Sequence, residues 1–160
     1  MGKSGTFLTV VAVVAGLLIG SVGAAYLHHQ ALRESEFRGA MLFSALITPP
    51  NEELVGYMVG HNDPLPSVAS RCSNCHWQLG SEKKPSAVGS QFGPDLTASH
   101  MRETKKRRGG PAFAYDEHSF CRVLRDGLDP TMVIIDQVMP RYRASDLQCK
   151  DLWNFLISSR

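Results

Sequence analysis

The residues best placed to do chemistry in this chain are five in a row, Cys72-Ser73-Asn74-Cys75-His76. Two thiols at this spacing can each form a thioether with one vinyl group of a single haem, and the adjacent histidine can then supply an axial nitrogen to the iron. The C-x-x-C-H pattern is the attachment signature of c-type haem. The sequence therefore predicts one covalently attached haem c on Cys72 and Cys75, with His76 as an iron ligand.

Two other kinds of site share part of this pattern. A bare C-x-x-C also fits a dithiol redox site or one half of a zinc site. The dithiol interpretation requires a strand before the motif and a βαβ context, and neither is visible in the sequence. The zinc interpretation requires a second ligand pair, but the chain has no second C-x-x-C and no H-x-x-x-H. Haem is the interpretation that uses the histidine as well as both thiols.

A six-coordinate iron needs a ligand opposite His76, and the best candidate is Met139. It is followed by Pro140, which cannot join a helix interior, so we expect Met139 on an extended strap. A thioether favours ferrous iron more than a second imidazole does, so this ligation raises the potential. Met132 is the nearest rival. Weaker candidates, none of which we assign to the iron, are Met101, His100, His118, His28, His29 and His61.

Two cysteines, Cys121 and Cys149, remain once the motif thiols are assigned to haem. Both fall on apolar faces of expected helices. An even leftover pair in an exported domain favours a disulfide, with two buried free thiols as the alternative.

The amino-terminal residues contain a long apolar run. Residues 4–32 contain no Asp, Glu, Lys or Arg, and the 22 residues at 6–27 would span about 33 Å as a helix, close to a bilayer core of about 30 Å. The run is longer than the apolar region of a signal peptide, although small residues at 22–25 leave cleavage open. We expect a single membrane-spanning anchor in a bacterial inner membrane, with the rest of the chain in the periplasm.

The remaining pattern indicates helices, and we find no alternation long enough for a sheet. One short helix is expected at the motif. A second begins after Asp116 as its N-cap and stops at Gly127. A third begins at a capping box made by Ser145 and Gln148, and its apolar stripe should pack on the motif helix. We expect an anchor at 1–30, a stalk and linker at 31–65, and a compact domain at 66–160.

Taken together, these strings resemble a class I c-type cytochrome over about residues 66–160. The resemblance rests on the C-x-x-C-H motif, on residues 93–97 (Gly-Pro-Asp-Leu-Thr), on 139–142 (Met-Pro-Arg-Tyr), and on the closing helix with Trp153. It implies an all-α class I cytochrome c fold around one haem, and it implies that the carbonyl of Pro94 orients the ring of His76. The chain departs from the family in lacking the usual Gly and aromatic pair in the helix before the motif.

A second departure from the family is a basic loop that is longer than in a minimal member. It contains Arg102, Lys105, Lys106, Arg107 and Arg108, while the whole chain has a net charge of +2. One short basic run is not a nucleic-acid-binding composition. It fits a solvated loop, or a docking patch that steers an acidic redox partner or meets anionic lipid.

These observations predict a one-electron carrier and not an enzyme, working on its own or as a subunit of a respiratory or dehydrogenase complex. Iron held by His76 and Met139 has no open position for oxygen or peroxide, and its ligands serve both oxidation states. Haem catalysis or gas sensing is the alternative, and it requires a displaceable ligand opposite His76. A structural subunit whose haem takes no part in electron transfer is a third possibility.

Overall fold

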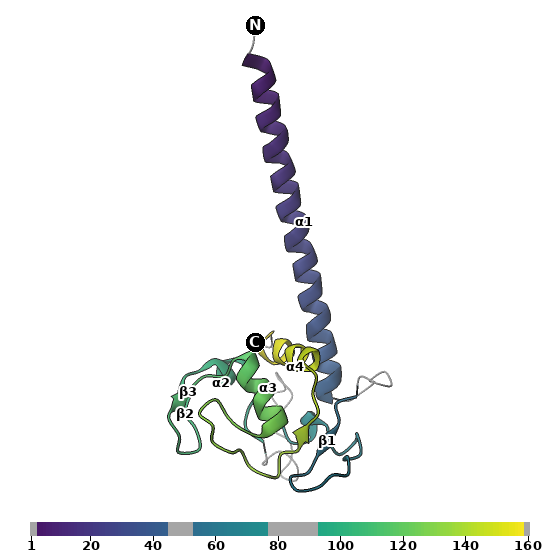
Figure 1. The fold of residues 1–160 in the computed structure, drawn as a ribbon, viewed down its shortest axis with the longest axis vertical. Helices are drawn as coiled ribbons and strands as arrows, with labels where there is room; N and C mark the ends of the chain where they lie inside the picture. The colour runs from purple at the N-terminus through teal and green to yellow at the C-terminus, as the bar shows by residue number, and fades with distance from the viewer. Residues whose placement is uncertain (1–2, 45–52, 77–92, 159–160) are drawn as a thin grey trace, which may run out of the picture. The chain divides into compact units, whose positions relative to one another are not determined.

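The computed structural model describes residues 3–44, 53–76 and 93–158, with side chains described from residue 20 onward. By its internal contacts the chain forms two compact units, residues 1–34 and residues 35–160. Helix α1 (Lys3–Ser44) supplies the described part of the first unit, and its last turns belong to the second. The motif, Met139 and the two remaining cysteines all lie in the second unit, whose helices and strands are labelled in Figure 1.

The expected membrane-spanning helix over residues 6–27 is corrected by the structure. In the part of the chain that the structure describes, no helix combines the length and the apolar character needed to cross a membrane. The apolar run is also not an element of its own. It is continuous with a helix that goes on through His28, His29 and charged residues to Ser44.

Helix α3 (Glu117–Asp126) begins and ends where the sequence predicts. The side chain of Asp116 accepts a hydrogen bond from the backbone N–H of Ser119 at 2.7 Å, and the Ser119 hydroxyl accepts one from the N–H of Asp116 at 3.0 Å. Gly127 closes the helix in the left-handed region with φ 69°. A residue with a Cβ is strained there, so glycine is the natural stop.

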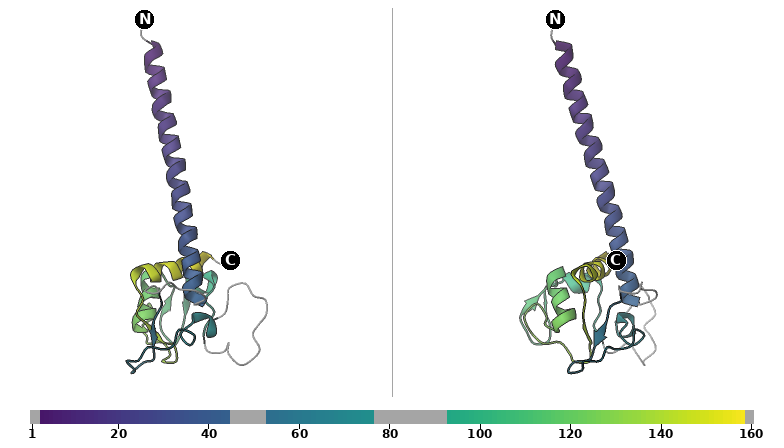
Figure 2. Two further views of the ribbon diagram at one scale, coloured as in Figure 1. Left: turned by 90° about the vertical axis from the view of Figure 1, so that its right-hand side faces the viewer. Right: turned by 45° about the vertical axis from the view of Figure 1, so that its right-hand side comes forward.

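Helix α4 (Asp146–Ser158) also begins at its predicted capping box. The backbone N–H of Ser145 donates to the side chain of Gln148 at 2.9 Å, and the N–H of Gln148 donates back to the Ser145 hydroxyl at 3.1 Å. The apolar stripe is buried as expected: α4 packs on α3 and on the short helix α2 (Ala98–Arg102), and Cys72 of the motif packs against the same core cluster. Figure 2 shows α3 and α4 side by side in both views. The stripe consists of Cys149, Leu152, Trp153 and Leu156.

Residues 35–44 of α1 cross α4 at very close range. A Cβ added at Gly39 would lie 2.0 Å from the backbone oxygen of Asp151, so only glycine permits this approach. One turn later, the ring of Phe43 packs on the ring of Phe155 with centroids 5.4 Å apart. We expected no glycine and aromatic pair on a helix before the motif, and this expectation is wrong. Gly39 and Phe43, one turn apart on α1, form such a pair against α4.

A buried carboxylate fixes the same crossing. Asp151 is 2 % exposed, and it accepts hydrogen bonds from the hydroxyl of Ser35 and from Nε of Arg38, the latter at 2.7 Å. The guanidinium of Arg38 makes a second contact with Asp151 at 3.1 Å. A buried charge needs such partners, so this contact specifies which turn of α1 meets α4.

The prediction of an all-α class I cytochrome c fold is wrong, because the described residues also form two small antiparallel sheets. Strand β1 (Gly56–Tyr57) pairs with β4 (Arg141–Tyr142), and β2 (Lys105–Lys106) pairs with β3 (Ala112–Phe113). Strands of two residues are too short to produce a visible alternation of apolar and polar side chains. The sheet β1–β4 joins the segment before the motif to the segment after Met139.

Candidate functional site

The motif lies on a single tight turn. A 3-10 helix, η1 (Cys72–Asn74), is followed by Cys75, and the backbone N–H groups of Cys75 and His76 donate to the carbonyl of Cys72 at 3.2 and 2.8 Å. The side-chain amide of Asn74 donates to the carbonyl of Val68 at 2.8 Å and ties the turn to the preceding loop. The expected helix is thus reduced to one turn among the described residues, and residues 77–92 lie outside them.

The two motif thiols are half-buried and are not bridged to each other. Cys72 packs against the hydrophobic core cluster that α3 and α4 contribute to. Burial raises the pKa of the Cys72 thiol to about 12. The motif therefore presents two unbridged thiols one turn apart, the first of them protonated at neutral pH.

Tyr142 of β4 links the motif to the segment that contains Met139. Its buried hydroxyl donates to the carbonyl of Ser70 at 2.8 Å, just before the motif turn. Burial, together with the nearby Cys72 and Cys75, raises the pKa of this phenol. The phenol therefore stays a neutral donor, and it fixes β4 against the start of the motif.

The ring of His76 is oriented by a backbone carbonyl. His76 is 7 % exposed, and its Nδ1 lies 2.9 Å from the carbonyl oxygen of Pro94. Because a carbonyl can only accept, Nδ1 carries the proton and Nε2 keeps its lone pair. Burial lowers the pKa of His76, and the Pro94 contact offsets part of that effect. This is the contact that the resemblance implied, and a neutral ring with a free Nε2 is the form that binds a metal.

Gly93 makes the contact between the histidine and the carbonyl possible. A Cβ at this position would lie 2.5 Å from Nδ1 of His76 and 2.6 Å from the carbonyl oxygen of Cys75. The backbone therefore passes directly against the imidazole. Gly93 stands in the Gly-Pro string on which the resemblance rests, but its role becomes visible only in this close approach.

The two candidate thioethers have different environments. Met139 is half-buried and packs against the same core cluster as Cys72. Its backbone is held by Arg141, whose Nη1 donates to the Met139 carbonyl at 2.6 Å. Met132, in contrast, is 58 % exposed at a backbone φ of 65°. The structure thus places Met139, and not Met132, on the cluster that the motif also touches.

The remaining candidate ligands lie elsewhere. Met101 is buried in the core cluster, and His100 is half-buried on α2. Among the described residues, no three His, Cys, Asp or Glu side chains gather into a group that could hold a metal ion. The exposed histidines are His28, His29, His61 and His118.

Cys121 and Cys149 form a disulfide, with an S–S distance of 2.06 Å. These are the two cysteines left over by the motif. Both are buried, and the bond joins α3 to α4 across 28 residues of chain that include Met139.

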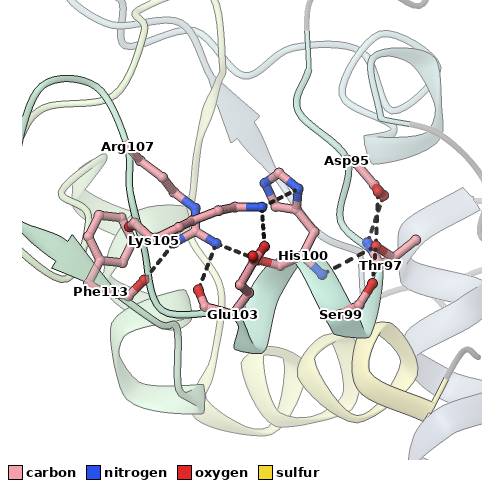
Figure 3. Close-up of polar contacts among 8 residues, drawn as sticks. All are labelled: Asp95, Thr97, Ser99, His100, Glu103, Lys105, Arg107 and Phe113. Atoms are coloured by element: carbon pink, nitrogen blue, oxygen red, sulfur yellow. Dashed lines mark hydrogen bonds and ion pairs between the residues drawn. The ribbon is translucent and has the colours of Figure 1, made fainter.

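Most of the basic loop is engaged within the chain, as Figure 3 shows for part of it. Lys105 pairs with Glu103 at 2.7 Å. The guanidinium of Arg107 lies 4.8 Å from the ring centroid of Phe113 and donates to that residue's carbonyl at 2.6 Å. It also donates to the carbonyl of His100. Arg107 therefore braces the β2–β3 hairpin against α2.

The next basic residue, Arg108, is also used internally. Its Nη2 pairs with Asp129 at 3.1 Å, and the carboxylate of Asp129 is fully buried. Of the five basic side chains proposed for docking, Arg102 and Lys106 are exposed, and neither has such a bracing contact with the residues that the structure describes. Spacing alone could not reveal this, because the acceptors are backbone carbonyls and a distant carboxylate.

Comparisons with protein-family models, with curated proteins and with solved structures found no match for this chain. The arrangement of its own residues therefore supplies the argument for function.

Proposed function

We propose that this chain is a c-type cytochrome, a one-electron carrier with a single haem c attached to Cys72 and Cys75. The iron would be held by Nε2 of His76 and by the thioether of Met139. One observation carries the proposal. Nδ1 of His76 is bonded to Pro94 at 2.9 Å, so the ring is fixed in the tautomer and orientation that leave Nε2 available beside two unbridged thiols.

The surrounding residues fit such a group. Cys72 and Met139 pack against one apolar cluster, which is the environment a porphyrin requires. Nε of Arg71, the residue before the motif, is buried and has no hydrogen-bond partner in the described part of the chain. A buried guanidinium nitrogen is a donor for a carboxylate, and haem carries two.

When bound, haem supplies the one-electron couple of its iron. The protein contributes two neutral ligands that suit both oxidation states, one of which is held rigidly by Pro94. The apolar cluster covers part of the Met139 side chain. Ligands that need not change between the two states favour electron transfer over the binding of small molecules.

The disulfide supports a location outside the cytoplasm. Bridges such as Cys121–Cys149 form and persist in oxidising compartments. We propose that the domain works after export, in a compartment such as the bacterial periplasm, and exchanges electrons with redox proteins there. Service within a respiratory or dehydrogenase complex is consistent with this role.

The proposal is tested by producing the full chain in a bacterium that attaches haem c in its periplasm. We expect the mass of one haem to be added covalently and a six-coordinate low-spin spectrum in both oxidation states. The double variant C72S/C75S should lose the covalent haem. C121A/C149A, which removes the other two cysteines, is the matched control and should keep it. Wild-type protein without added haem would refute the proposal.

The ferric spectrum separates the carrier from the alternative of haem catalysis or gas sensing. A charge-transfer band of the iron–thioether bond, lost in Met139→Ala, supports the carrier. If wild-type protein binds carbon monoxide as readily as Met139→Ala, the position opposite His76 is open, and catalysis or sensing replaces electron transfer. If electron flow through a partner system persists undiminished in Met139→Ala, the haem is not on its route.

A further inference from the structure

The segment that carries Met139 has little regular structure of its own. Between α3 and α4 the chain forms one isolated bridge, Leu128 with Ile134, and then the two-residue strand β4. Several of its apolar side chains face solvent, among them Ile134 at 66 % and Val138 at 49 % exposure. Its position therefore depends on the pairing of β4 with β1 and on attachments at its two ends.

Helix α3 holds both ends of this segment. Arg122 donates to the carbonyl of Asp129 at 3.2 Å, at the start of the segment. Arg125 donates from Nε to the carbonyl of Ala144 at 2.8 Å, at its end. Arg125 also pairs with Asp146, in the first turn of α4, at 2.7 Å. Two arginines of one helix, three positions apart, thus clamp the beginning and the end of the segment.

The disulfide closes the same loop covalently. Cys121 precedes Arg122 on α3, and Cys149 lies one turn after Asp146 on α4, with exposures of 8 % and 1 %. The 28-residue connection between the two cysteines contains the whole segment. While the bond is intact, the segment cannot leave α3 by separating α4 from it. Opening must then occur within the segment, against Arg122 and Arg125.

We propose that the Cys121–Cys149 disulfide, assisted by Arg122 and Arg125, is a clasp that keeps Met139 on the iron and thereby keeps the sixth position closed to other ligands. The inference rests on the proposed function. These residues are positioning residues, because they act through the chain that carries Met139. A thioether is an uncharged and weak ligand, so its occupancy depends on how tightly the chain holds it.

Breaking the clasp changes the chemistry available to the protein. The apparent affinity for an exogenous ligand is proportional to the fraction of molecules whose binding position is open. Cleavage of the disulfide by a dithiol gives two cysteine thiols and oxidises the dithiol to its own disulfide. The open form should then bind a neutral nitrogen ligand such as imidazole in place of Met139.

The test compares ferric wild-type protein with C121A/C149A, both carrying haem, by titration with imidazole. We expect binding at least about tenfold tighter in the double variant, because a larger fraction of its molecules has lost the thioether bond. Amides of residues 133–139 should exchange with solvent faster as well. Leu156→Ala, buried in the same core but outside the loop from 121 to 149, is the control for a general loss of stability. It should change imidazole affinity by less than about twofold at a comparable decrease in Tm.

A second variant, Arg125→Gln, keeps the disulfide and tests the clamp if the double variant folds poorly. It should tighten imidazole binding in the same direction by a smaller factor. If wild type, C121A/C149A and Arg125→Gln all carry haem and bind imidazole with equal affinity, the clasp is overturned. The proposed carrier function would still stand. Tighter binding in Leu156→Ala equal to that in C121A/C149A would overturn it too. Absence of covalent haem in the wild type would instead remove the proposed function, and the clasp with it.

Discussion

Two regions of the second unit differ in how they bury their apolar side chains. The helical scaffold consists of α3, α4 and residues 35–44, and its Leu152 and Leu156 are each 1 % exposed. The site segments are residues 66–76, 93–97 and 128–140, where Val68 and Ile134 are 60 % and 66 % exposed. The apolar side chains that are almost fully buried, Cys149, Leu152 and Leu156, all lie in the scaffold. The site segments contribute partly buried side chains to the same core, among them Cys72 and Met139.

The same contrast holds for polar contacts. In the scaffold, both helices have reciprocal caps, and the buried Asp151 has two partners. The motif turn, in contrast, is tied to its surroundings by separate hydrogen bonds from His76 to Pro94, from Asn74 to Val68 and from Tyr142 to Ser70. Substitutions in the scaffold should therefore mainly change stability. Substitutions in the site segments should mainly change what the site can bind.

The largest effect on stability is expected from Asp151→Ala. The change leaves Ser35 and Arg38 without their buried acceptor, and breaking a buried ion pair on one side costs about 3–5 kcal/mol. Since Arg38 is 36 % exposed and water can reach it, we expect the lower end of that range. Urea unfolding monitored by helical circular dichroism gives the free energy of unfolding for both proteins.

The matched control for this variant is Asp146→Ala. It removes the other carboxylate of α4 that pairs with an arginine, but this carboxylate is 94 % exposed. Exposed ion pairs contribute little, so the change in free energy of unfolding should be too small to resolve. Equal losses in Asp151→Ala and Asp146→Ala would contradict the idea that burial makes the α1–α4 contact strong.

Local signals in the sequence were sufficient for the scaffold helices. Asp116, Gly127 and the Ser145–Gln148 pair lie where α3 and α4 begin or end, because capping depends on residues three or four positions apart. The pairing of Cys121 with Cys149 could be predicted because they are the only two cysteines left once the motif thiols are assigned to haem. The candidate ligands His76 and Met139 could likewise be named from short strings.

Contacts between distant segments could not be predicted in this way. Glycine is required at position 39 because the backbone of Asp151, more than one hundred positions away, passes against it. Arg108 pairs with the carboxylate of Asp129, which follows α3 in the sequence. The two sheets went unseen because each strand is only two residues long. Gly93 carried a visible signal, a glycine before a proline, but its reason lies in the position of the His76 ring.

A smaller effect is expected from Gly93→Ala, in the site segments. The added Cβ would lie 2.5 Å from Nδ1 of His76, so the ring must move away from the Pro94 carbonyl. Overpacking of this kind costs about 2 kcal/mol. Nitrogen NMR of labelled histidine should show faster solvent exchange of the Nδ1 proton. Pro94→Ala retains the backbone carbonyl and should leave that exchange nearly unchanged. Slow exchange in Gly93→Ala would show that the close approach does not constrain the ring.

The smallest effect concerns Asp129 of the site segments, whose carboxyl group is fully buried and accepts several hydrogen bonds. Burial by itself would raise its pKa, but hydrogen bonds from Val133, Thr131 and Arg108 outweigh burial and lower the pKa below the ordinary 3.8. A carboxyl whose pKa is lower in the folded state adds stability above its unfolded pKa. That stability is lost as the pH falls through the folded value. Wild-type protein should therefore lose about 1 kcal/mol more than Asp129→Asn as the pH falls from 5 through 3.8 and below.

Unfolding by urea at a series of pH values measures this difference, with Asp136→Asn as the control for an exposed carboxylate of the same segment. Parallel curves for wild type and Asp129→Asn would mean that the carboxylate gains nothing from its partners. A difference confined to acidic pH would instead show that buried hydrogen bonds to Asp129 anchor the start of the Met139 segment. In that case the weakly held part of the site segments is limited to residues 134–139. This is the stretch that the clasp must hold if Met139 is to stay on the iron.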